Sequence, residues 1–160
     1  MNRRNWISRV SGLLALSWLP ILPFGSASAA RTFPLSKSKQ EWKGLLPADA
    51  YHVLFEEGTE PAGSSALNAE KRTGTFVCAA CNLPLFDSAH KYKSGTGWPS
   101  FWQPLADAVG TLTDFKLVFP RTEYHCSRCG GHQGHVFNDG PRPTSLRYCN
   151  NGAALRFVPA

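Results

Sequence analysis

Residues 124–131 read Tyr-His-Cys-Ser-Arg-Cys-Gly-Gly, a C-x-x-C pair between a strand-like lead and a glycine turn. A second pair with the same spacing occupies Cys78 and Cys81. This spacing lets both thiolates of one turn converge on a single ion, and two such turns complete a tetrahedral site with Zn–S distances of about 2.3 Å. Four cysteines leave no open coordination position, so the metal is expected to be structural. We therefore predict one structural zinc ion, bound by Cys78, Cys81, Cys126 and Cys129.

The two cysteine pairs have alternative interpretations. An exported protein could form disulfides, and a C-x-x-C pair can also be a redox dithiol of the thioredoxin type. The dithiol interpretation requires a helix that begins after the first cysteine. Pro84 follows Cys81 shortly and no helical period begins there. Two matched pairs are also more typical of one closed metal site than of two separate dithiols.

The composition predicts one β-rich domain. Hydrophobic residues make up 42% and charged residues 18% of the 160 residues, an ordinary globular balance. The 14 glycines and 12 prolines indicate many turns and few long helices. We expect one short helix over residues 47–57 with Gly58 as its C-cap, followed by a surface loop over residues 58–73. Strands are expected at residues 75–77, 116–118, 135–137 and 154–158.

The first thirty residues have the pattern of a signal peptide. Two arginines, Arg3 and Arg4, precede an apolar stretch over residues 10–24 that two prolines interrupt. Residues 27–29 then read Ala-Ser-Ala, a typical cleavage site. A membrane anchor is the alternative, but a span needs about 20 apolar residues. We predict a signal peptide over residues 1–29, no stable membrane insertion after its cleavage, and a periplasmic location. The paired arginines favour the twin-arginine route, in which zinc is loaded before export.

The positive charge does not indicate a nucleic-acid partner. The formal net charge is +6, but three of the 17 basic residues, Arg3, Arg4 and Arg9, lie in the predicted signal peptide. The remaining 14 basic residues against 11 acidic ones leave +3, with no run of lysine or arginine. We therefore predict no nucleic-acid binding.

The fifth cysteine, Cys149, has no partner in either pair. In an oxidising compartment such a residue is either buried and inert or kept for the chemistry of its thiol. Arg147 stands two residues before it and Asn151 two residues after it, on the same face of an expected strand. A nearby cation lowers the pKa of a thiol, and Asn151 can donate a hydrogen bond to a thiolate. This polar surrounding favours a reactive Cys149 over an inert core cysteine.

Six segments of the chain together match one family: residues 58–61, 76–81, 94–101, 121–123, 126–137, and 140–144 continued by 147–149. In sequence and in order they resemble the B-type methionine sulfoxide reductases, which reduce the R epimer of methionine sulfoxide. The resemblance covers residues 46–160, which we take as the reductase domain, preceded by a lead segment over residues 30–45. It implies two small antiparallel β-sheets that meet like a tent, with short helices on the N-terminal side.

The resemblance implies a chemical role for Cys149 and two histidines. A sulfoxide sulfur is a poor electrophile until its oxygen is protonated or strongly hydrogen-bonded, so a thiolate needs a proton donor beside it. Cys149 is the expected thiolate, while His132 and His135 are the candidate donors because imidazole titrates near neutral pH. Either histidine could instead be a zinc ligand, although the four cysteines make that unnecessary.

Three further residues are predicted to build the substrate pocket. Trp98 is the expected apolar seat for the S-methyl group, with plain core packing as the alternative. Phe137 is expected to form another wall. Asp139 either orients Arg147 or a histidine through a charged hydrogen bond or is only a turn residue.

Attack by Cys149 is expected to leave a sulfenic acid. Many members of the resembled family have a recycling cysteine where this chain has Thr96, so we predict reduction by an external thiol, from a thioredoxin-fold partner or a small thiol. Oxidised proteins are the expected substrates.

Asn150 stands where the family commonly has an aliphatic residue, and we expect it to change packing without loss of activity.

Two other functions compete with this one. A zinc-ribbon-like module could bind a ligand or nucleic acid without catalysis, but it leaves Cys149 and the export signal unexplained. A thiol–disulfide oxidoreductase would need a reactive cysteine pair, and a tightly bound zinc ion would argue against it.

Overall fold

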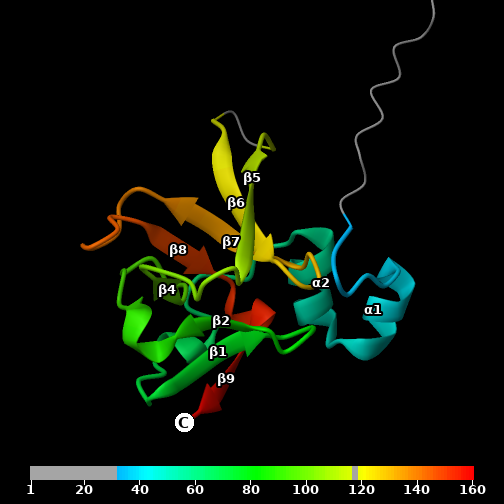
Figure 1. Cartoon of the computed structure of the whole chain (residues 1–160), viewed down its shortest axis with the longest axis horizontal. Coiled ribbons are helices and arrows are strands. Elements are labelled where there is room, and N and C mark those ends of the chain that lie inside the picture. Colours follow the sequence, from blue (N-terminus) through cyan, green and yellow to red (C-terminus); the bar gives the residue numbers. More distant parts are fainter. Residues whose placement is uncertain (1–31, 117–118) are drawn as a thin grey trace, which may run out of the picture. The chain divides into compact units, whose positions relative to one another are not determined.

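The computed structural model describes residues 32–116 and 119–160 of the chain (Figure 1). The predicted signal peptide, residues 1–29, lies outside the described residues. Within the described part, two short helices precede a set of antiparallel strands, and short 3-10 helices lie in the connections (η1 Ala66–Asn68, η2 Ser88–His90 and η3 Gly152–Ala154). None of the described helices has the length and apolar character needed to cross a membrane.

Two helices open the described chain. Helix α1, Lys39–Leu45, lies in the lead segment and begins at a capping box between Ser38 and Glu41. Helix α2, Ala48–Glu56, corresponds to the predicted helix. The C-cap of this helix is Glu57, whose backbone is left-handed with φ 55°, so the prediction of Gly58 as the C-cap was wrong. Gly58 is constrained by space instead, because a Cβ there would lie 2.3 Å from the ring of His52.

The smaller sheet has the strand order β2-β1-β9. Both neighbours of the central strand run antiparallel to it. The predicted strands at residues 75–77 and 154–158 are both found here, except that Ala154 belongs to η3. The strands are β1 Gly74–Cys78, β2 Pro84–Asp87 and β9 Leu155–Pro159.

The larger sheet is antiparallel throughout, with the order β3-β4-β8-β7-β6-β5. The strand predicted at residues 116–118 was wrong at Lys116. This residue lies in a bend after β5, and its amide donates to the Asp114 carboxylate at 2.8 Å. Residues 117–118 lie outside the described residues. The strands are β3 Lys91–Tyr92, β4 Ser100–Phe101, β5 Val109–Asp114, β6 Arg121–Cys126, β7 His132–Phe137 and β8 Arg147–Asn150.

Aromatic rings join the two sheets. Phe76 and Phe86 of the smaller sheet pack on Phe101 of the larger one, with ring centroids 4.9 Å and 4.1 Å away. Tyr124 of β6 meets Phe86 edge-on. All four side chains are fully buried, so the core lies where the sheets meet. The predicted fold class, mainly β with two antiparallel sheets, is confirmed.

Candidate functional site

The two C-x-x-C turns have the same backbone geometry. In each, the amide of the first cysteine donates to the carbonyl five residues later, and its own carbonyl accepts from the amide four residues later, all at 2.9 Å. This turn needs a left-handed residue directly after the second cysteine. Asn82 has φ 59° in the first turn and Gly130 has φ 74° in the second. The turns after β1 and β6 are therefore built alike, and each presents its two thiols on one side.

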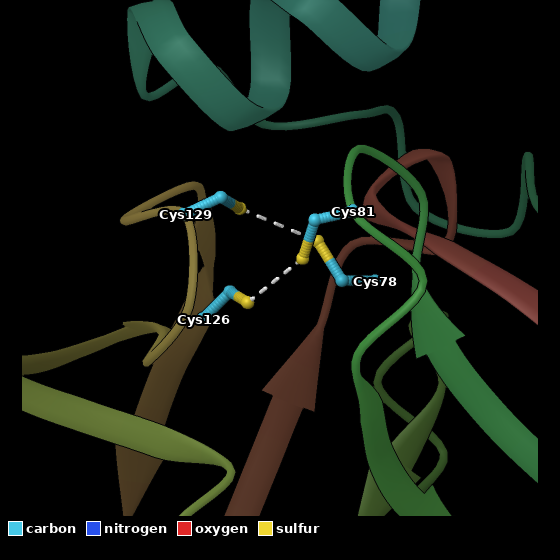
Figure 2. Close-up of side chains that lie close together, drawn as sticks. All are labelled: Cys78, Cys81, Cys126 and Cys129. Carbon is cyan, nitrogen blue, oxygen red and sulfur yellow. Dashed lines mark hydrogen bonds between the residues drawn. The ribbon is translucent and has the colours of Figure 1, made fainter. Parts of the chain in front are cut away.

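The four thiols of these turns converge at one point (Figure 2). Cys78 Sγ lies 3.7 Å from Cys129 Sγ, and Cys81 Sγ lies 3.5 Å from Cys126 Sγ. All four sulfurs lie within 4.8 Å of one another. A tetrahedral ion with Zn–S bonds of about 2.3 Å separates its sulfurs by about 3.8 Å, whereas a disulfide bond is about 2.05 Å long. The cluster could therefore hold one metal ion, and its cysteines are not joined as disulfides.

Cys149 lies on β8 between two neighbouring strands. Its Cα is the register partner of His135 on β7 and of Ser100 on β4. The half-buried thiol opens into a cavity of about 130 Å³. Five of the eight predicted catalytic and substrate-binding residues line this cavity, whereas His132, Arg147 and Asp139 do not. The full lining is Thr59, Trp98, Arg121, Gly134, His135, Phe137, Cys149, Asn150 and Asn151.

Arg147 is held by Asp139 in a two-pronged ion pair. Its Nε and Nη2 atoms each donate to one carboxylate oxygen at 2.8 Å. The guanidinium also lies 4.3 Å from the ring centre of Phe137, a cation–π contact. Arg147 is buried while Asp139 is largely exposed. Asp139 thus makes the charged hydrogen bond to Arg147 that was one of its two predicted roles.

The thiol of Cys149 is not a ready thiolate. Burial raises its pKa above the ordinary value, and this effect outweighs the lowering by the charge of Arg147 and by a hydrogen bond from Thr96. The expectation that Arg147 lowers the pKa was right in sign, but burial decides the net direction. The Thr96 hydroxyl is itself fixed by Ser94 at 2.8 Å, and Ser94 contacts Ser100 at 2.7 Å.

The side chain of Asn151 forms hydrogen bonds to two backbone groups. Its Nδ2 donates to the Gln133 carbonyl and its Oδ1 accepts from the Glu60 amide, both at 3.1 Å. The predicted hydrogen bond to Cys149 is therefore replaced by contacts that fix the end of β8. Glu60 also accepts from Trp98 Nε1 at 3.1 Å through its carbonyl. These bonds place the indole beside the end of β8.

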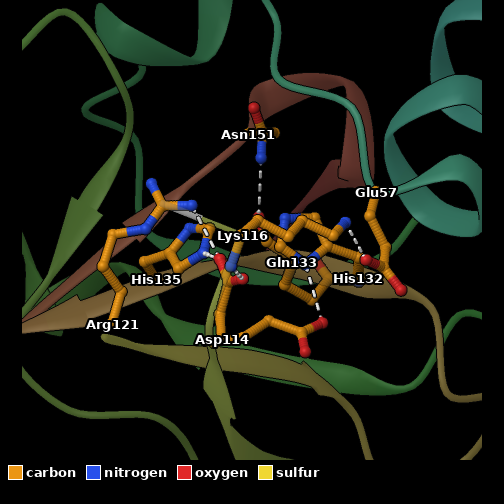
Figure 3. A network of polar contacts seen from close by, with 9 residues as sticks. Glu57, Asp114, Lys116, Arg121, His132, Gln133, His135 and Asn151 are labelled. Atoms are coloured by element: carbon orange, nitrogen blue, oxygen red, sulfur yellow. Dashed lines mark hydrogen bonds and ion pairs between the residues drawn. The ribbon is translucent and has the colours of Figure 1, made fainter. Parts of the chain in front are cut away.

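Each predicted histidine is paired with a carboxylate (Figure 3). His132 Nδ1 lies 2.8 Å from Glu123, and His135 Nε2 lies 2.8 Å from Asp114. Arg121 donates to the same Asp114 oxygen at 2.7 Å. A cavity of about 380 Å³ is lined by both histidines and shares Thr59, Arg121 and His135 with the cavity at Cys149. The histidines are thus engaged by carboxylates, not by the cysteine cluster.

The surroundings of these pairs shift the pKa values of His135, Asp114 and Glu123. Burial lowers the pKa of His135, although the hydrogen bond to Asp114 opposes it. The amide of Lys116 and then the ring of His135 hold the pKa of Asp114 well below its usual range. Burial raises the pKa of Glu123, but the hydrogen bond and charge of His132 outweigh it and leave a lowered value. Both carboxylates are therefore ionised partners that orient the imidazoles.

Four residues that build the site had no role predicted from the sequence. Glu60, Arg121 and Glu123 stand in segments that carry the resemblance, which was the available signal. Asp114 had no such signal, because only the pairing of β5 with β6 brings it opposite Arg121.

Comparison with known proteins agrees with this geometry. A family model described as the SelR domain matches residues 46–159. A peptide methionine sulfoxide reductase MsrB of Leptospira interrogans is 52% identical over 126 residues, which cover 78% of this chain and 96% of that protein. A protein of the same name from Pseudomonas putida is 46% identical over 126 residues, with 78% and 95% covered. The chloroplastic peptide methionine sulfoxide reductase B1 of Arabidopsis thaliana is 47% identical over 122 residues, with 76% and 60% covered. The chain therefore belongs to the SelR domain family, the family of the B-type methionine sulfoxide reductases.

Proposed function

We propose that the chain reduces the R epimer of methionine sulfoxide, mainly in oxidised proteins, with Cys149 as the nucleophile. The observation that carries this proposal is the cavity at Cys149, which combines a thiol, an imidazole and an indole. The names of the relatives support the same activity. A non-catalytic zinc-ribbon module is not favoured, because it gives this cavity no purpose.

The first step transfers one oxygen between two sulfurs. The Cys149 thiolate attacks the sulfoxide sulfur and forms an S–S bond, while the imidazolium form of His135 gives a proton to the sulfoxide oxygen. The resulting hydroxyl then moves to the Cys149 sulfur as the S–S bond breaks. Methionine leaves with its sulfur reduced, and Cys149 becomes a sulfenic acid. Trp98 and Phe137 form apolar walls for the S-methyl group. His132 lines the neighbouring cavity and not this one. We assign it the role of supporting the orientation of His135.

Arg147 is the charged group that stabilises the thiolate of Cys149. Arg147 lowers the pKa of Cys149, while Asp139 holds the guanidinium in place. Asn151 supports the site by fixing the chain after Cys149 to β7 and to Glu60.

An external reductant is needed for the second half of the cycle. Two thiols reduce the sulfenic acid, which returns the Cys149 thiol and gives one disulfide and one water. We assign this role to a thioredoxin-fold partner or a small thiol, because Thr96 stands beside Cys149 and the other four cysteines are gathered in the metal cluster.

The cysteine cluster is proposed to hold one zinc ion. Sulfur spacings near the tetrahedral value and the like geometry of the two turns support zinc at Cys78, Cys81, Cys126 and Cys129. The ion would supply folding free energy by joining the ends of β1 and β6, and no chemical step passes through it.

We also propose export of the chain. Residues 1–29 would act as a twin-arginine signal peptide, residues 30–45 as a lead segment, and residues 46–160 as the reductase domain in the periplasm. The paired arginines and the Ala-Ser-Ala site support this proposal. Fractionation of cells that express the chain, beside an Arg3→Lys, Arg4→Lys variant, would test it by loss of the periplasmic protein.

Turnover of the two separated epimers tests the activity. With dithiothreitol as reductant, the wild type should reduce the R epimer, and Cys149→Ser should not. Reduction of the S epimer, or activity that survives the substitution, would refute the proposed function.

A further inference from the structure

A buried line of hydrogen bonds connects the cysteine cluster to the strand that carries Cys149. Gln133 of β7 donates from Nε2 to Cys78 Sγ at 3.5 Å. Its Oε1 accepts from Asn150 Nδ2 at 3.4 Å, and Asn150 Oδ1 accepts from the Tyr124 hydroxyl at 2.6 Å. All four residues are fully buried, with exposures of 0%. The line runs from a thiol of the cysteine cluster, through the residue directly after Cys149, to the Tyr124 hydroxyl of β6.

The backbone of Gln133 makes a second connection. Its carbonyl accepts from the amide and from Nδ2 of Asn151, at 2.9 and 3.1 Å, and Figure 3 shows the side-chain bond. Asn150 Nδ2 also donates to the Asn151 carbonyl at 2.8 Å. One residue of β7 therefore contacts the cysteine cluster on one side and both residues that follow Cys149 on the other.

Stability alone gives no reason for this polar line. Burial of an amide or a phenol costs desolvation free energy, and its hydrogen bonds in the core only offset that cost. Apolar side chains of similar shape can fill the same space with nearly equal stability of the fold. A polar group in a core does fix one arrangement, since any shift of β8 would leave Gln133, Asn150 or Tyr124 without a partner. The line thus favours a single position of β8 relative to the cysteine cluster.

The bond to sulfur also has an electronic consequence. An N–H donor beside a metal-bound thiolate withdraws charge from the sulfur and makes it a weaker nucleophile toward oxidants. Outer contacts of this kind tune metal sites as well as orient their ligands. In an enzyme that meets oxidants, such protection of Cys78 would slow oxidative loss of the metal.

We propose that Gln133 is a positioning residue that ties the Cys149 strand to the metal site and shields the Cys78 thiolate from oxidation. The proposal rests on the zinc site and on the role of Cys149 given above. Through Gln133, loss of the metal ion would change the reactivity of Cys149, although the ion takes no part in the chemistry.

Three variants and one control separate this role from simple packing. Gln133→Met keeps the length of the side chain and removes its polar groups. A triple variant, Tyr124→Phe, Gln133→Met, Asn150→Leu, removes the whole line and leaves none of these polar groups without a partner. Gln133→Glu keeps the acceptor for Asn150 and loses the amide donor to sulfur. The control, Gln103→Met, makes the same change at an exposed position.

The zinc-bound proteins are treated with hydrogen peroxide in the presence of a chromogenic zinc chelator. We expect zinc release from Gln133→Met and from the triple variant to be about tenfold faster than from wild type, the lower end of typical losses at outer contacts of metal sites. In the cobalt(II)-substituted proteins, the sulfur-to-metal charge-transfer band should move to lower energy, because the thiolate has lost its N–H donor. Gln133→Glu should resemble Gln133→Met in both measurements.

The second measurement follows Cys149 itself. Iodoacetamide labelling at fixed pH, quantified at Cys149 by mass spectrometry, should be about threefold faster in both Gln133→Met and the triple variant, because loosening of β8 exposes the thiol. Packing alone predicts that the triple variant regains the wild-type values of zinc release, cobalt spectrum and labelling, and that result would overturn the proposal. If the triple variant fails to fold, Gln133→Glu decides, because it keeps the size of the side chain and loses only the amide donor to sulfur; wild-type zinc release and a wild-type cobalt spectrum in this variant would also overturn the proposal.

These measurements do not use sulfoxide turnover. Absence of R-sulfoxide reduction in the wild type would refute the proposed function and leave the coupling intact, whereas wild-type behaviour of the triple variant would refute the coupling alone.

Discussion

Cys149 and His135 are direct register partners across β8 and β7. Directly opposed residues of an antiparallel pair project to one face, with Cβ atoms about 4.5–5.5 Å apart. Both side chains accordingly line the same cavity, whereas His132 does not. We therefore expect the two histidines to differ in their effect on turnover.

Substitution of His135 should reduce turnover more than substitution of His132. Loss of a proton donor typically costs about 10²- to 10⁴-fold in rate, so His135→Asn should lose at least that lower amount in turnover of the R epimer. His132→Asn, whose ring contacts Glu123 outside the cavity, is the matched control. Equal losses in the two variants would contradict the assignment.

Removal of Arg147 should make Cys149 harder to ionise. The thiolate is the form that iodoacetamide labels, so labelling rises with pH through the pKa. The wild-type midpoint should lie above the ordinary thiol value of about 8.5, because burial raises the pKa. Arg147 lowers that pKa, so Arg147→Met should move the midpoint upward by about one unit. Arg147→Lys keeps the charge and should shift it less; an unchanged midpoint in Arg147→Met would contradict the account.

Loss of one cluster cysteine should cost both the metal and the fold. Cys126→Ser should bind no zinc and unfold at a much lower temperature, because structural zinc sites contribute folding free energy directly. Cys149→Ser, a matched cysteine substitution outside the cluster, should keep one zinc per chain and its melting temperature within a few degrees. Elemental analysis and thermal unfolding check both. Full stability of Cys126→Ser would show that the cluster is not a structural metal site.

A cysteine at Thr96 should change how the enzyme is recycled. The Thr96 hydroxyl contacts the Cys149 thiol, so Thr96→Cys places a second thiol beside the sulfenic acid. We expect a disulfide between residues 96 and 149 after one turnover, with loss of water. Thr96→Ser is the control and should give none. Peptide mapping of the oxidised proteins decides, and absence of the disulfide in Thr96→Cys would place this side chain outside reach of Cys149.

Local patterns predicted the parts of this molecule that depend on local spacing. The C-x-x-C turns, the helix before Gly58 and three of the four predicted strands follow from residues near one another in sequence. The strand at Lys116 was wrong because the Asp114 side chain competes for the backbone amide and starts a bend.

Long-range pairing set the parts that spacing could not predict. Asp114 reaches His135 only through the register of β5, β6 and β7. Asn151 was expected at the thiol, but Glu60, 91 residues away along the chain, accounts for one of its bonds. The net pKa of Cys149 depends on burial, which requires the folded structure.

A single turnover without reductant decides whether Cys149 completes the chemical step alone. Wild-type protein with its zinc is mixed with excess methionine (R)-sulfoxide and a dimedone probe, and the products are quantified by mass spectrometry. We expect one methionine per chain and one dimedone adduct, on Cys149, with the four cluster cysteines unmodified. A disulfide from Cys149 to Cys78, Cys81, Cys126 or Cys129 in place of the adduct would contradict the one-cysteine cycle.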